Sequence, residues 1–135
     1  MTKSRNKNRK RDISILLQIR DKQNELLNEL QFFGVKRVQD LSPSDRMRPS
    51  VRRGLVQMVG DIFELTNGLR DETKEKLGLN LMVIKHFRNS ASHNYGILSN
   101  EMAYACISHC ISKELRQNVL REFEILQTEL NKNKK

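Results

Sequence analysis

The fold is decided by residues 49–69, which read PSVRRGLVQMVGDIFELTNGL. Their apolar side chains recur every three or four positions, the spacing that aligns side chains on one face of an α-helix. This face consists of Val51, Leu55, Met58, Val59, Ile62, Thr66 and Leu69. Proline suits the first turn of a helix, so this amphipathic helix begins either at residues 41–45, LSPSD, with Pro43 in its first turn, or only at Pro49.

Helical spacing continues on both sides of this segment, and no stretch has the strict alternation of a strand. The sequence predicts three further helices, over residues 12–33, 79–87 and 100–130. Gly34 ends the first of these, residues 71–76 form a charged and exposed connection, and the last helix bends near Ser112. Short loops between four helices are typical of an up-and-down bundle. The predicted fold class is therefore all-α, a four-helix bundle.

Each predicted helix has an apolar face that we expect to be buried. In the first helix it consists of Ile13, Leu16, Leu17, Ile19, Leu26, Leu27 and Leu30. In the third it consists of Leu79, Met82, Val83 and Phe87. In the fourth it consists of Tyr104, Ile107, Ile111, Leu115, Val119, Phe123, Leu126 and Leu130.

The charge of the chain is concentrated at its two ends. The formal net charge is +9, from 25 Lys and Arg against 16 Asp and Glu. Residues 1–11 carry six basic residues and residues 131–135 carry three, without an acidic residue in either range. We therefore expect one balanced domain over 12–130 between a disordered basic arm and a basic tail. Such an arm is either a solubilising tail or a site for polyanions.

Composition also restricts the compartment and the chemistry. No apolar run approaches the roughly 20 residues of a membrane-spanning helix, which predicts a protein without membrane contact. Two cysteines four positions apart are typical of thiols in a reducing compartment, so we expect a cytoplasmic location. Cys106, His109 and Cys110 lie within about one helical turn and are either zinc ligands or buried structural residues. A fourth ligand is not evident, and we predict neither a metal nor another cofactor.

The segment richest in side chains suited to catalysis is residues 87–96, FRNSASHNYG. An imidazole at His93 and a guanidinium at Arg88 are the groups that cleave RNA without a metal, since one moves protons and the other stabilises a phosphorane. In an ideal helix these two positions lie about 140° apart, so the helix must end between them or a second chain must contribute. Transesterification needs both a base and an acid, and a two-fold dimer would supply two such histidines.

These residues resemble a known motif. The run Arg88-Asn89-x-x-x-His93-x-Tyr95 is similar to the R-x4-H-x-Y motif of the HEPN superfamily, in its HepT-like toxin branch. The resemblance covers most of residues 11–130, and the departure is Ser90-Ala91-Ser92, where relatives have larger apolar residues. It implies an all-α, homodimeric, metal-independent endoribonuclease, the toxin of a toxin–antitoxin pair. The implied antitoxin is a minimal nucleotidyltransferase that attaches AMP to the motif's tyrosine.

Carried onto this chain, the resemblance implies that Arg88 and His93 are catalytic, Asn89 is a supporting polar group and Tyr95 is the AMPylation target. Lys85, three positions before Arg88, is a candidate RNA contact or a member of a solvated face. Arg52 and Arg53 are further candidate RNA contacts, because they belong to a local basic cluster with Arg46 and Arg48. The leading hypothesis is an endoribonuclease with its site at a dimer interface. The alternative is a non-catalytic helical module that binds a nucleotidyltransferase or RNA.

Overall fold

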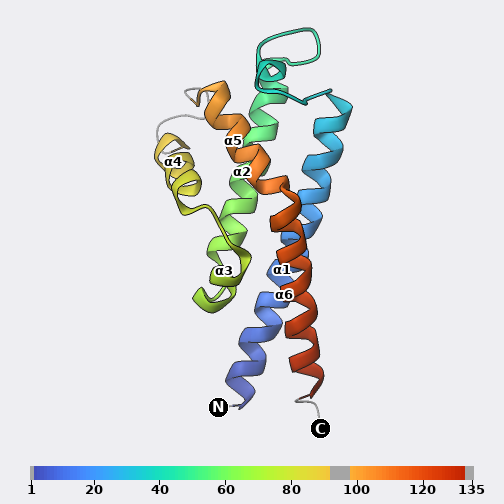
Figure 1. Cartoon of the computed structure of the whole chain (residues 1–135), viewed down its shortest axis with the longest axis vertical. Coiled ribbons are helices and arrows are strands. Elements are labelled where there is room, and N and C mark those ends of the chain that lie inside the picture. The colour runs from blue at the N-terminus through green and yellow to red at the C-terminus, as the bar shows by residue number, and fades with distance from the viewer. Residues whose placement is uncertain (1, 92–97, 133–135) are drawn as a thin grey trace.

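The computed structural model describes residues 2–91 and 98–132, and every regular element in these two ranges is a helix (Figure 1). The α-helices are α1 (Thr2–Phe32), α2 (Pro49–Asn67), α3 (Asp71–Leu77), α4 (Leu81–Ala91), α5 (Asn100–Ile111) and α6 (Lys113–Lys132). A 3-10 turn, η1 (Val38–Leu41), lies in the loop between α1 and α2. The prediction of an all-α protein is confirmed.

The chain travels up and down the long axis of the molecule. In Figure 1, α1 rises to the loop at the top, α2 descends, α3 and α4 lead upward again, and α5 and α6 descend to the end of the chain. α1 packs mainly against α6 and α2, and α5 packs against α2 and α4. The helices therefore form a bundle, but the third and fourth passes of the chain along it each consist of two helices, α3 with α4 and α5 with α6.

Residues 71–76, predicted as an exposed connection, belong to α3. The prediction was wrong because it relied on the charged residues of this segment and missed two buried positions four residues apart, Thr73 and Leu77. Gly78 ends the helix in the left-handed conformation, with φ at 67°, where a Cβ would be strained. The amide of Asn118 on α6 donates to the Leu77 carbonyl at 2.9 Å and so satisfies one terminal acceptor.

The predicted disordered arm also differs from the structure, because α1 begins at Thr2 and includes residues 2–11. The last part of α6 lies beside this segment. There the Glu129 carboxylate forms an ion pair with the Arg9 guanidinium at 3.2 Å. Arg9 also donates to the Asn6 side chain at 3.2 Å. At the other terminus α6 continues to Lys132, and residues 133–135 lie outside the described part. Composition predicted an arm because it could not show that the two chain ends lie side by side.

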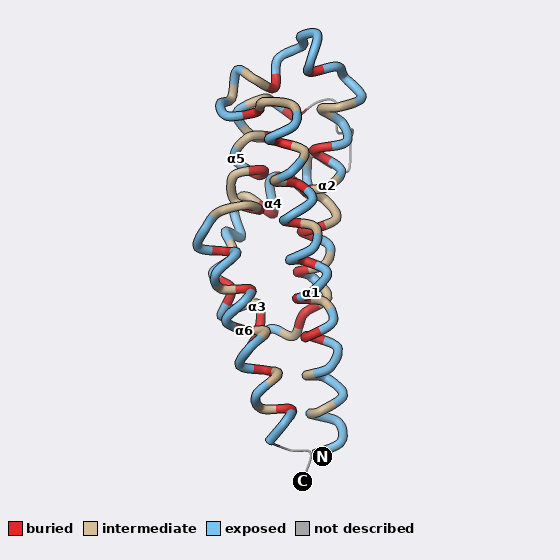
Figure 2. Tube along the Cα trace, turned by 90° about the vertical axis from the view of Figure 1, so that its right-hand side faces the viewer, coloured by how far each residue is buried: buried red, intermediate tan, exposed pale blue. Residues whose placement is uncertain are grey.

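The core is built on one buried line of α1. Its positions alternate in steps of four and three, as in a coiled coil, and are Asp12, Leu16, Ile19, Gln23, Leu26 and Leu30. In Figure 2 buried stretches, drawn in red, recur along α1. Two residues predicted to be buried are exposed instead, Leu17 and Met82, because each lies beside the buried line of its helix rather than on it.

The predicted bend near Ser112 is confirmed as a break between α5 and α6. The Ser112 hydroxyl accepts from the Leu115 amide at 3.1 Å and caps the start of α6. The last carbonyls of α5 also have partners. Gln23 donates to the Cys110 carbonyl at 2.8 Å, and Arg116 donates to the Ile111 carbonyl at 2.9 Å. Gln23 is thus a buried polar residue whose partner is a helix end.

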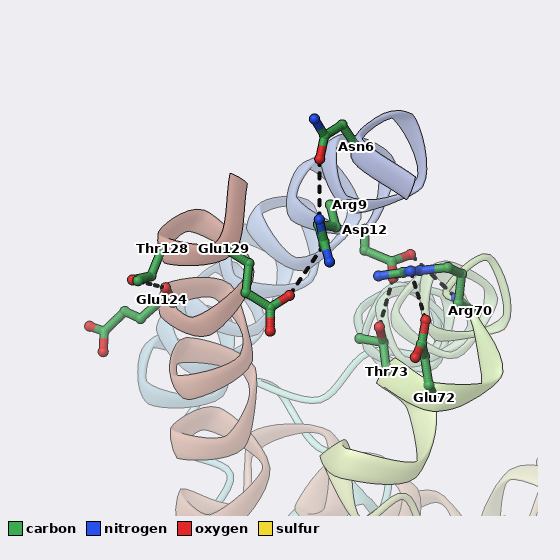
Figure 3. Close-up of polar contacts among 9 residues, drawn as sticks. All are labelled: Asn6, Arg9, Asp12, Arg70, Glu72, Thr73, Glu124, Thr128 and Glu129. Atoms are coloured by element: carbon green, nitrogen blue, oxygen red, sulfur yellow. Dashed lines mark hydrogen bonds and ion pairs between the residues drawn. The ribbon is translucent and has the colours of Figure 1, made fainter. Parts of the chain in front are cut away.

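The second buried polar residue of α1, Asp12, ties the α2–α3 corner to the bundle (Figure 3). Its carboxylate accepts from the Arg70 Nε at 2.7 Å, the Thr73 hydroxyl at 2.7 Å and the Arg70 backbone N–H at 3.3 Å. Arg70 also pairs with Glu72 at 2.7 Å. A buried carboxylate is tolerated only with such partners, so each of them depends on the others.

Replacing Asp12 with alanine is expected to destabilise the fold by about 3 kcal/mol, because it removes three hydrogen bonds and leaves buried donors unpaired. Urea unfolding followed by circular dichroism measures this loss. Arg9→Gln is the control, since it breaks a partly exposed ion pair on the same helix and should cost less than about 1 kcal/mol. Equal losses in both variants would contradict the role given to Asp12.

Candidate functional site

The described part of the motif lies on the last turn of α4. Arg88 and Asn89 are both exposed there, and a cation in the last turn is favoured by the helix dipole. His93 and Tyr95 lie outside the described residues, as does Ser92. The structure therefore describes the two flanks of the candidate site. One flank is the helix that ends in the motif, and the other consists of the residues that follow it.

α4 is fixed to the bundle by the residue next to Arg88. Phe87 is buried, and its ring meets that of Phe63 on α2 edge to face, with centroids 5.3 Å apart. Ile84, three positions earlier, is also buried. These two residues form the inner face of α4, which leaves the side chains of Lys85 and Arg88 on its outer side.

The start of α4 is held through a histidine of α5. The Asn80 side chain accepts from the Val83 amide at 3.1 Å, as an N-cap does, while the Asn80 backbone N–H donates to Nε2 of His109 at 3.0 Å. Because Nε2 acts as an acceptor, His109 is neutral and carries its proton on Nδ1. We predicted helix from Leu79, although an asparagine directly before an apolar run is a signal for the cap.

Arg52 of α2 holds the other flank of the motif. Its guanidinium donates to the Leu98 carbonyl at 2.6 Å and to the Asn100 side-chain oxygen at 3.0 and 3.2 Å. Asn100 in turn donates to the Ser42 hydroxyl at 3.1 Å. The motif segment is thus followed by a residue whose backbone is bound to a different helix. Sequence reasoning missed this contact because it joins residues 46 positions apart.

The three candidate RNA contacts therefore have different surroundings. Arg53 and Lys85 are exposed, the first on α2 and the second on α4. Arg52 is partly buried, and its guanidinium is engaged with Leu98 and Asn100. These hydrogen bonds give Arg52 a positioning role beside its predicted RNA contact. Nothing in the described geometry brings Arg53 and Lys85 into a common group.

Of the three candidate zinc residues, His109 is hydrogen-bonded to the Asn80 backbone and the two cysteines are buried. Cys106 and Cys110 are buried free thiols, and burial raises the pKa of Cys106 to about 11. Burial also lowers the pKa of His109 below its ordinary value of 6.5, while nearby Glu114 raises it by a smaller amount. Among the residues that the structure describes, no three His, Cys, Asp or Glu side chains gather as metal ligands would.

Comparison with protein-family models, with curated proteins and with solved structures finds no match for this chain. Within residues 2–91 and 98–132, no helix combines the length and apolar character that crossing a membrane requires.

Arg52→Gln is expected to lower the free energy of unfolding by about 2 kcal/mol, because charge-assisted bonds to a carbonyl and an amide are lost. Amide hydrogen exchange in the first turn of α5 should accelerate at the same time. Arg53→Gln is a matched control on the adjacent, exposed position, with an expected change below about 0.5 kcal/mol. Indistinguishable results for the two variants would refute the anchoring role.

The neutral state of His109 predicts a dependence of stability on pH. Its pKa is lower in the folded than in the unfolded state, so the unfolded chain binds more protons between these values. Stability should therefore fall as the pH decreases from 6.5 through the lowered pKa. Urea midpoints at pH 7.0 and 5.5 should differ more for the parent than for His109→Gln, whose side-chain oxygen still accepts from Asn80. Parallel shifts in both proteins would exclude His109 as the source.

Proposed function

We propose that this protein is a metal-independent endoribonuclease of the HEPN superfamily, with its active site in residues 88–95. The observation that carries the proposal is that the residues on both sides of the motif are fixed to the bundle. Arg88 stands exposed on the last turn of a helix fixed by buried Phe87, and the segment ends at Leu98, whose carbonyl is bound by Arg52. A short chemical segment between two fixed ends suits a site that must hold its groups in one geometry.

The proposed reaction is transesterification of RNA. The 2′-hydroxyl attacks the neighbouring phosphorus, the bond from phosphorus to the 5′-oxygen breaks, and a 2′,3′-cyclic phosphate forms. His93 takes the proton of the 2′-hydroxyl or gives one to the leaving oxygen. Arg88 stabilises the negative charge of the phosphorane, and Asn89 supports the phosphate with its amide.

A homodimer supplies the second proton-transfer group, because each chain has one histidine in the motif. The outer side of α4 supports this part of the proposal. Leu81 is 73% exposed and Met82 is 67% exposed, although both are large apolar residues on the helix that carries Arg88. A second copy packed on α4 would cover them and bring two motif segments together.

In the proposed biological setting the protein is the toxin of a toxin–antitoxin pair. Its partner is a minimal nucleotidyltransferase that attaches AMP to the hydroxyl of Tyr95. Such a group would add bulk and negative charge two residues from His93, where it would compete with an RNA phosphate for Arg88. The support for this setting is the resemblance of residues 88–95 to the R-x4-H-x-Y motif.

The test is cleavage of total RNA in EDTA by purified protein that mass spectrometry shows to be free of AMP. The parent should produce 2′,3′-cyclic phosphate ends, and Arg88→Ala and His93→Ala should each lower the rate at least about 100-fold. His86→Ala and Arg20→Ala are matched controls, because both remove exposed side chains of the same types. These two controls should cleave as the parent does.

Equal cleavage by all variants would refute the assignment of Arg88 and His93. Absence of cleavage by the unmodified parent, sedimenting as a dimer, would refute the nuclease and favour a non-catalytic binding module. Sedimentation of Leu81→Ser beside the parent shows whether the outer side of α4 forms the dimer.

A further inference from the structure

The fold brings the basic residues of both chain ends to one pole of the molecule. α1 begins and α6 ends side by side at the bottom of Figure 1, and Arg9 pairs with Glu129 across them. The described part of this pole includes Lys132 and all six basic residues of the N-terminal segment. Residues 12–130 carry 16 basic and 16 acidic residues, so the described cations of this pole account for most of the excess charge.

Four of these cations form a stripe on α1, which we call the basic stripe: Lys3, Lys7, Lys10 and Arg11. In helical projection they fall within about 100° of arc, and along the axis they span about 12 Å. All four side chains are exposed, on the side of α1 opposite buried Asp12 and Leu16. A continuous helix therefore presents them as a row, which a disordered arm would not do.

The basic stripe is a row of like charges. Among the described residues, none of its four members forms an ion pair. Glu129 is engaged by Arg9, and Glu124 points away from α1 in Figure 3. Lys3 and Lys7 lie four positions apart, as do Lys7 and Arg11, and like charges at this spacing repel. They also lie at the positive end of the helix dipole, so bound anions would relieve an unfavourable arrangement.

The surroundings of the stripe favour nucleic acid over other polyanionic partners. The segment 2–11, TKSRNKNRKR, contains no apolar residue. A helix that enters a membrane surface needs an apolar face, and a protein interface has an apolar centre. Regularly spaced phosphates need only cations and small polar donors, which Ser4 and Asn8 add beside the stripe.

We infer that the basic stripe of α1 is an RNA-binding surface, separate from the motif segment. This inference deepens the proposed nuclease function, because it names a surface that holds the substrate by its phosphates away from the bond that is cut. The contact is independent of base sequence, since a row of cations contacts phosphates and not base edges.

The test is binding of a fluorescent, 2′-O-methylated single-stranded RNA of about 20 nucleotides, measured by anisotropy. This probe cannot be cleaved by attack of a 2′-hydroxyl, so binding is measured without turnover. The stripe variant combines Lys3→Gln, Lys7→Gln and Lys10→Gln. The control variant combines Arg20→Gln, Lys76→Gln and Lys113→Gln, which removes the same charge from exposed positions elsewhere.

The stripe variant should bind at least about tenfold more weakly at 100 mM KCl, and the slope of log Kd against log salt should fall by about 2. The control variant should bind nearly as the parent does. The melting temperature of the stripe variant should equal or exceed that of the parent, because repulsion is removed. A lower melting temperature with lost binding would instead indicate a structural defect and overturn the inference.

Equal binding by both variants would overturn the inference, and so would tighter binding of polyglutamate or of vesicles with 30% phosphatidylserine than of RNA. The Arg88→Ala protein separates this result from the proposed activity. Because Arg88 contacts a single phosphate in the proposed active site, its loss should weaken binding of the methylated RNA less than the loss of the three stripe lysines, whatever its rate of cleavage. Loss of binding in Arg88→Ala alone, with the stripe variant unaffected, would place the RNA contact at the motif and refute the stripe.

Discussion

The structure depends on the burial of one line of α1 against α6 and α2. This line, from Asp12 to Leu30, includes two polar residues, Asp12 and Gln23. Each is satisfied by a distant element, α3 in one case and the end of α5 in the other. The apolar members provide a driving force without direction, whereas the two polar members require specific partners. The line therefore determines both that the helices associate and where the chain changes direction.

The candidate site is supported by helices of this bundle and not by α1 itself. α4 packs against α5 and is positioned by the contact of its Phe87 with Phe63 of α2 and by the hydrogen bond from Asn80 to His109 of α5. Arg52, also on α2, holds the residues that follow the motif. α2 thus supports both flanks of the segment that carries the proposed chemistry. The outer side of α4 is uncovered, with Leu81 and Met82 exposed.

The proposed nuclease has its two functions at different places on the fold. Chemistry is assigned to the segment between α4 and α5, and attraction of RNA to the pole where α1 begins and α6 ends. The first needs groups held in fixed positions, which the flanking contacts support. The second needs only a row of cations, whose effect extends about a Debye length and does not require close fit. Separate surfaces for attraction and for cleavage are physically compatible for a polymeric substrate.

The sequence by itself determined the all-helical class, the stop at Gly34 and the break at Ser112, because helical periodicity and caps are local properties. It also singled out residues 88–95, whose chemistry is a matter of residue type. Only the tertiary structure decided that 71–76 and 2–11 are helical, since their stabilising partners, Asp12 and Glu129, lie far away in the chain. The anchoring of Arg52 and the gathering of charge at one pole have the same cause: contacts between segments distant in sequence leave no periodic signal.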